Sequence, residues 1–224
     1  MDSGQCFTFH SFATIHYPLP TTHCPLPTTY CPMQTTSVIL VGVGGQGILL
    51  ASEIVAQAAV EAGFDVKTNE VHGMAQRGGS VIAQIRYGRE VHSPVIAKGT
   101  ASVLGSLERM ETLRYTDYLA ENGLAVVSSQ KIVPVTASVG SVGYPDIDET
   151  LLKRYFPRLV YLDAVAEATK LGNPKAANTI LLGAMSSRLD IPQDAWNTAI
   201  RKSVKPKFVD VNLQAFQCGR DSAF

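Results

Sequence analysis

The side chains best suited to chemistry lie together in one short segment, residues 70–80 (EVHGMAQRGGS). Arg77 follows Gln76 and precedes a glycine pair, so its guanidinium can approach a carboxylate or phosphate and bind it through two parallel hydrogen bonds. His72 can hydrogen-bond or transfer a proton near neutral pH. The segment therefore predicts catalytic roles for Arg77, Gln76 and His72.

Two of these side chains also have a purely structural interpretation. Arg77 can pair with a local acid such as Glu70, and His72 can satisfy a backbone carbonyl. A turn between strands needs neither the polar side chains nor the glycines for folding, which favours contact with a ligand or a partner. The sequence leaves both interpretations open.

A glycine turn about thirty residues upstream is the second segment with recognisable chemistry. It follows a buried strand over residues 38–43 and precedes a helix, and it satisfies the pattern G-x-G-x-x-G. Such a turn lets the backbone approach a phosphate, which the free N–H groups of the helix N-terminus then bind. The predicted cofactor-binding residues are Gly42, Gly44, Gly45, Gln46 and Gly47.

The glycine turn has two other interpretations. A dinucleotide site also needs an acid near the end of the second strand, and Glu70 lies 23 residues after Gly47, so a self-sufficient NAD-dependent dehydrogenase is the alternative function. The chain after Glu70 runs into a hairpin instead of a helix, which counts against that alternative. The turn can also be a close-packed connection that binds nothing.

The body of the chain alternates strand and helix patterns. A single α/β domain is expected, with a Rossmann-like start, one hairpin, and a mixed, mainly parallel sheet covered by helices on both faces. Val81, Ala83, Ile85 and Tyr87 should share one face of the strand over residues 80–87. The other expected strands are 38–43, 64–68, 101–105, 124–128 and 159–163, and the expected helices are 48–62, 107–119, 148–155, 164–171, 174–188, one after Pro192, and 209–218.

Composition limits the partners. The 224 residues contain 19 basic and 19 acidic side chains, so no net field attracts a polyanion, and we expect neither nucleic acid nor membrane as a partner. Cys218 is the only cysteine after residue 36, which predicts a reducing, cytoplasmic location and no cysteine-ligated cluster in this region. We predict no metal site.

Residues 1–36 differ from the rest. They hold five of the twelve prolines and three of the four cysteines but no lysine or arginine, and a seven-residue repeat runs through them. This composition predicts a disordered extension, or a native start at Met33, ahead of a catalytic domain over 37–224.

The glycine turn and the polar segment together resemble the beta subunits of indolepyruvate:ferredoxin oxidoreductases, in the gamma-type or domain III branch of the 2-oxoacid:ferredoxin oxidoreductases. The resembling segments are GVGGQG (42–47), EVHGMAQRGGSV (70–81), HSPVI (92–96), LERMETLRY (107–115), GNPKAAN (172–178) and LGA (182–184). The resemblance covers residues 37–218.

The resemblance implies a subunit of an enzyme that oxidatively decarboxylates aryl pyruvates to acyl-CoA and reduces ferredoxin. Thiamine diphosphate, Mg²⁺ and [4Fe-4S] clusters then belong to a larger alpha subunit, the partner of this chain, and CoA is a cosubstrate. The leading hypothesis places residues 42–47 and 70–80 in one crevice that completes the partner's site. A noncatalytic docking module is a further alternative.

Overall fold

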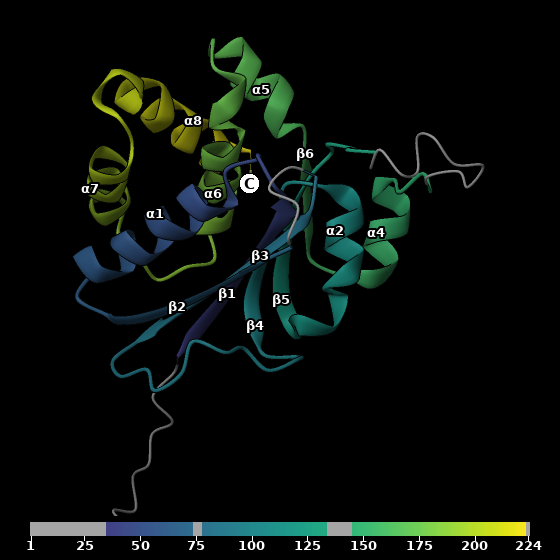
Figure 1. Ribbon diagram of the computed structural model, residues 1–224, viewed down its shortest axis with the longest axis horizontal. Helices are drawn as coiled ribbons and strands as arrows, with labels where there is room; N and C mark the ends of the chain where they lie inside the picture. The colour runs from purple at the N-terminus through teal and green to yellow at the C-terminus, as the bar shows by residue number, and fades with distance from the viewer. Residues whose placement is uncertain (1–34, 74–77, 134–144, 223–224) are drawn as a thin grey trace, which may run out of the picture. The chain divides into compact units, whose positions relative to one another are not determined.

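The computed structural model describes residues 35–73, 78–133 and 145–222, within the unit Met33–Phe224 (Figure 1). Its six-stranded sheet has the order β2-β3-β1-β4-β5-β6. The strands are β1 (Thr36–Val43), β2 (Asp65–His72), β3 (Ser80–Gly88), β4 (Ala101–Ser106), β5 (Leu119–Ser128) and β6 (Leu159–Leu162).

Strand directions confirm the predicted mixed sheet. β1, β4, β5 and β6 are parallel neighbours, whereas β3 is antiparallel to both β1 and β2. The β2–β3 hairpin therefore inserts β3 between β1 and β2. Its register pairs Val43 with Ser80, which sets the carboxyl end of β1 beside the turn of the hairpin.

Helices cover both faces of the sheet, as predicted (Figure 1). Those packed on one face are α1 (Ile48–Glu61), α6 (Ala177–Ser186), α7 (Gln193–Ser203) and α8 (Val209–Asp221), and α5 (Ala164–Lys170) packs beside α6 and α8. The other face carries α2 (Arg109–Arg114) and α4 (Glu149–Tyr155). Short 3-10 turns are η1 (Thr116–Tyr118), η2 (Pro174–Ala176) and η3 (Pro206–Phe208). No helix within the described ranges is long and apolar enough to cross a membrane.

The alternation predicted for β3 is confirmed. Val81, Ala83, Ile85 and Tyr87 are buried in the cluster under α1, whereas Ile82 joins the cluster on the opposite face. Successive side chains of a strand point to opposite faces, so this local pattern fixes the orientation of the hairpin.

Three predicted boundaries are wrong by four or five residues. β2 continues past residue 68 to His72, because it pairs with β3 along its whole length. The helix predicted over 107–119 ends at Arg114, and the strand predicted over 124–128 begins already at Leu119, so the turn-like pair Asn122 and Gly123 lies inside β5. The β4–β5 register shifts beside them, so this Asn-Gly pair marks an irregularity in a strand.

The buried Tyr87 gives a prediction about alkaline stability. Burial raises the pKa of Tyr87 to about 12, so the folded protein retains a proton that the unfolded chain loses near pH 10. The resulting stability is complete below pH 10 and is lost as pH rises towards 12, by about 2 kcal/mol. Urea unfolding at pH 9–12 should show this loss, and Tyr87→Phe should abolish it. Tyr155→Phe, at a 58% exposed position, is the matched control, and an equal slope in both variants would contradict the assignment.

Candidate functional site

The glycine turn and the polar segment meet at the carboxyl end of β1. The Gly44 N–H donates to the Gly79 carbonyl oxygen at 2.8 Å, and the Gly78 N–H donates to the Gly44 carbonyl oxygen at 3.5 Å. The Gly73 N–H donates to the Ser80 carbonyl oxygen at 3.2 Å and closes the base of the loop. The two segments that the sequence singled out therefore share one edge of the sheet. Gln76 and Arg77 lie outside the described residues.

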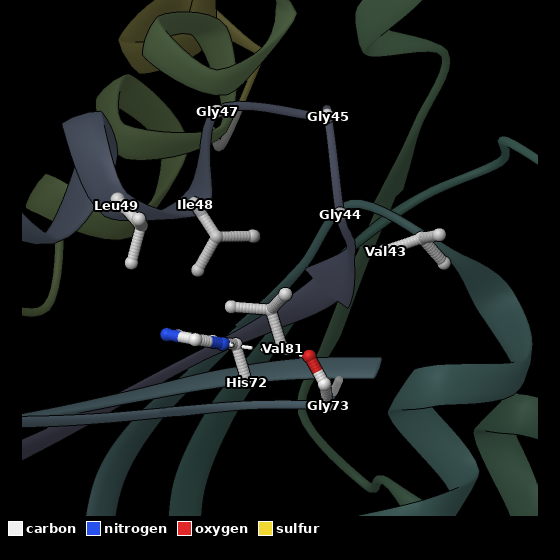
Figure 2. Close-up of a pocket in the computed structure, with 9 residues that line it drawn as sticks. All are labelled: Val43, Gly44, Gly45, Gly47, Ile48, Leu49, His72, Gly73 and Val81. Carbon is white, nitrogen blue, oxygen red and sulfur yellow. Dashed lines mark hydrogen bonds between the residues drawn. The ribbon is translucent and has the colours of Figure 1, made fainter. Parts of the chain in front are cut away.

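An open hollow of about 510 Å³ lies between these segments (Figure 2). Figure 2 shows Ile48 and Leu49 of α1 on one side of the hollow, with His72 and Val81 of the hairpin facing them. The remaining lining residues are Val43, Gly44, Gly45, Gly47 and Gly73. Four of the five side chains in the lining are therefore aliphatic, and the four glycines contribute only backbone.

Two of the predicted cofactor-binding glycines have a packing role. A Cβ at Gly42 would lie 2.7 Å from Oε1 of Gln46 and 2.9 Å from Cδ1 of Ile48. Gly47 has φ +83°, and a Cβ there would lie 2.7 Å from Nδ2 of Asn178, which donates to the Gly47 carbonyl oxygen at 3.1 Å. Gly45, in contrast, has φ +102° and open space around it. Packing thus explains why positions 42 and 47 are glycine. Gly45 faces solvent, and packing does not restrict it.

The side chain of Gln46 is committed to the protein framework. Its Oε1 accepts from the Val43 N–H at 2.7 Å, and its Nε2 donates to the Leu107 carbonyl oxygen and to Oε1 of Gln130, both at 2.8 Å. These bonds tie the glycine turn to the ends of β4 and β5. If Gln46 contacts a cofactor, it therefore does so through its backbone.

The partial positive charge at the N-terminus of α1 is not neutralised by an acidic side chain in its first turn. α1 begins after Gly47 with no side-chain cap and no acidic residue in its first turn. The backbone N–H groups at the start of a helix carry a partial positive charge, which favours an anion nearby.

A second hollow, of about 550 Å³, lies at the same glycine turn. Gln46, Gln130, Lys175 and Asn178 contribute its polar side chains. Lys175 is exposed and brings a full positive charge close to Gly45 and Gly47, which also line this hollow. Lys175 lies in the resembling segment 172–178, but no pattern in that segment alone indicates a ligand-binding residue.

The geometry removes the basis of the NAD alternative. A dinucleotide crevice needs the second strand beside the first, but β3 occupies the place next to β1. The carboxylate of Glu70 accepts a hydrogen bond from the Ser52 hydroxyl on α1 at 2.9 Å. Glu70 therefore supports α1, and it is not among the described residues that line the hollows at the glycine turn.

His72 lies at the rim of the hollow with an exposed ring. Its Nδ1 is 3.4 Å from the Gly73 carbonyl oxygen, a long distance for a hydrogen bond. The exposed ring is accessible to a ligand that enters the hollow.

Sequence reasoning missed a polar cluster beneath the polar segment. The Ser80 hydroxyl donates to the Glu111 carboxylate, which is 5% exposed and lies 3.4 Å from Nε of Arg114. The buried Glu108 caps α2 by accepting from the Met110 and Glu111 N–H groups at 2.7 and 3.0 Å. Glu108 and Glu111 fall inside the helix predicted over 107–119, and the sequence gives little signal for the cap because N-caps are usually Ser, Thr, Asp or Asn. In the described ranges, no three His, Cys, Asp or Glu side chains are grouped to hold a metal ion.

Comparisons with known proteins agree with this fold. The model of the pyruvate ferredoxin/flavodoxin oxidoreductase family matches residues 37–222. Indolepyruvate oxidoreductase subunit IorB of Archaeoglobus fulgidus is 40% identical over 191 residues, which cover 84% of this chain and 94% of the relative.

Solved structures show the same fold both alone and within a longer chain. The pyruvate oxidoreductase subunit PORC of Thermotoga maritima has a TM-score of 0.65 at 22% identity, over 84% of this chain and 96% of that one. The 2-oxoglutarate:ferredoxin oxidoreductase of Magnetococcus marinus, with 2-oxoglutarate, coenzyme A and succinyl-CoA bound, has a TM-score of 0.64 at 18% identity, over 85% of this chain and 31% of that one. These matches confirm the resemblance that the motifs indicated. The chain therefore belongs to the pyruvate ferredoxin/flavodoxin oxidoreductase family.

Proposed function

We propose that this chain completes the active site of an alpha subunit in a thiamine-diphosphate-dependent 2-oxoacid:ferredoxin oxidoreductase that acts on aryl pyruvates such as indolepyruvate. Its 40% identity to an indolepyruvate oxidoreductase subunit supports this substrate class. The observation that carries the proposal is the hydrogen bond from Gly44 to Gly79, because it holds the glycine turn and the polar segment at one edge.

The proposal divides the chemistry between two chains. Thiamine diphosphate, Mg²⁺ and [4Fe-4S] clusters lie in the alpha subunit, which supplies decarboxylation and passes electrons to ferredoxin. Cys218 is the one cysteine after residue 36, and a [4Fe-4S] cluster needs four thiolate ligands. This chain contributes binding and orientation.

CoA is the anionic ligand best suited to the glycine turn. In the proposal, its phosphates approach the first turn of α1 and Lys175, where N–H groups and an ammonium both favour negative charge. The Magnetococcus marinus relative is a protein with coenzyme A bound, which supports this ligand class. Gln76 and Arg77 then contact the partner's bound intermediate, CoA or an acid of the alpha subunit, while His72 contacts what enters the hollow.

Arg77→Ala tests the proposal in the complex. Coexpression with the alpha subunit should give normal assembly, but indolepyruvate-dependent ferredoxin reduction should fall by about tenfold or more, because a bidentate charged contact is lost. Arg77→Lys should recover little, since an ammonium cannot form the paired contact. Arg89→Ala, at an exposed position after β3, is the matched control.

Two outcomes would contradict parts of the proposal. Unchanged assembly and turnover with Arg77→Ala would remove Arg77 from the mechanism. Full turnover by the alpha subunit without this chain would favour the docking-module alternative instead.

A further inference from the structure

We infer that the hollow between α1 and the hairpin binds the aromatic side chain of the 2-oxo acid, and that Leu49 helps to set substrate selectivity. This inference rests on the proposed function, because it requires the edge of the sheet that carries the hollow to face the partner's active site. It goes further by assigning the aliphatic lining, to which the sequence analysis gave no role.

The chemical character of the hollow selects the ligand class. Ile48, Leu49 and Val81 line it with aliphatic carbon, and none of its described lining residues is Asp, Glu, Lys or Arg. A carboxylate placed against these side chains would lose water without gaining a charged side chain from the described lining, and the start of α1, which does favour an anion, is occupied by the CoA phosphates in the proposed function. An uncharged apolar group is favoured, and a side chain such as that of 2-oxoglutarate is not.

The arrangement of the lining suits a flat ring. Ile48 and Leu49 extend from α1 towards His72 and Val81 of the hairpin, so a ring between them contacts aliphatic carbon on one side and an imidazole on the other (Figure 2). Aromatic side chains gain from such contacts both by burial and by stacking. The volume of about 510 Å³ leaves room for an indole ring and its attached chain.

The exposure of Leu49 gives independent support. Leu49 is 48% exposed in the first turn of α1, next to Ile48, which is 3% exposed and belongs to the core. A leucine at that position does not contribute to the core, although exposed apolar side chains are common individually. Its position on the rim of a hollow lined by the glycine turn and His72 is what distinguishes it from other exposed residues.

Val60 provides the matched comparison. It lies on the same helix and is 52% exposed, but it is close to the end of α1 and does not line the hollow. Leu49→Gln and Val60→Gln therefore make equivalent exposed substitutions on one helix. Only the first changes the hollow.

The test uses the full chain assembled with its alpha subunit. Leu49→Gln should lower kcat/KM for indolepyruvate by about tenfold and leave kcat/KM for pyruvate unchanged, because apolar contacts discriminate substrates by about this factor. Inhibition by free indole should weaken by the same factor. Leu49→Trp, which fills the hollow, should also reduce turnover of indolepyruvate selectively, whereas Val60→Gln should change none of these values.

The outcomes separate this inference from the proposed function. An equal fall for both substrates with a raised KM for CoA would overturn the inference and assign the hollow to the arm of CoA. Unchanged selectivity in both Leu49 variants would also overturn it, although the proposed function would stand. Loss of dependence on this chain altogether would instead contradict the proposed function.

Discussion

Replacing Gly219 with valine should cause the largest loss of folding stability that we expect of a single substitution in this chain. A Cβ at Gly219 on α8 would lie 1.9 Å from the Ile180 carbonyl oxygen and 3.1 Å from the Ala184 nitrogen of α6. Gly183 makes the reciprocal approach, with a Cβ position 2.1 Å from the Phe216 carbonyl oxygen. Because backbone blocks both positions, the helices would have to separate, and we expect a loss of about 4 kcal/mol.

Gly219→Ala tests the same helix contact, because the contact determines whether alanine raises or lowers the folding stability. In a helix without this contact, alanine would stabilise by about 1 kcal/mol relative to glycine. At Gly219 the clash should reverse the sign, so urea unfolding should show a lower midpoint at an unchanged slope. Gln214→Ala, at an exposed position of α8, is the control for helix propensity. A Gly219→Ala variant as stable as the parent would show that α6 and α8 do not pack backbone against backbone.

The α6–α8 contact also reaches the candidate site. Asn178, in the first turn of α6, is 2% exposed and donates to the Gly47 carbonyl oxygen at the start of α1. The neighbouring Thr179 donates to Oδ1 of Asn212 on α8 at 2.7 Å. Moving α6 away from α8 would therefore displace the group that holds Gly47. Packing remote from the hollow thus fixes the position of the glycine turn.

Local patterns were sufficient to predict much of the fold. The period of two in β3 and the helical spacing of α1 depend only on neighbouring residues, so both were confirmed. The hypothesis that the two turns share a crevice rested on the carboxyl ends of adjacent strands. The insertion of β3 between β1 and β2, which places Ser80 beside Val43 and brings the turns together, was not predicted.

Contacts between distant residues were not predictable from local patterns. Asn122 and Gly123 have the residue types of a turn, yet pairing with β4 retains them in a strand. The pattern of glycines did not reveal which ones pack and which face solvent, because Gly42 is restricted by Gln46 and Ile48 whereas Gly45 is not. Such assignments require the tertiary structure.

Gln46→Glu should destabilise the folded protein by about 3 kcal/mol, the second large effect that we expect. The two side chains have nearly the same shape, but an ionised carboxylate cannot donate. Its oxygen would replace the Nε2 of Gln46 at 2.8 Å from both the Leu107 carbonyl oxygen and Oε1 of Gln130. The contact with the Leu107 carbonyl oxygen would thus become repulsive, whereas the Gln130 amide could turn to donate from its NH₂ group and the bond from the Val43 N–H to Oε1 would persist.

The pH dependence of this stability loss shows whether the charge of the new carboxylate causes it. The same contacts favour a protonated Glu at position 46, so its pKa should rise in the folded state, and the deficit should shrink as pH falls from 7 towards 4. Chemical denaturation of the parent and Gln46→Glu at both pH values measures this change, with Gln214→Glu on the exposed face of α8 as the charge-matched control. A deficit that does not change with pH, or that equals that of the control, would mean that the amide of Gln46 is not what ties the glycine turn to β4 and β5.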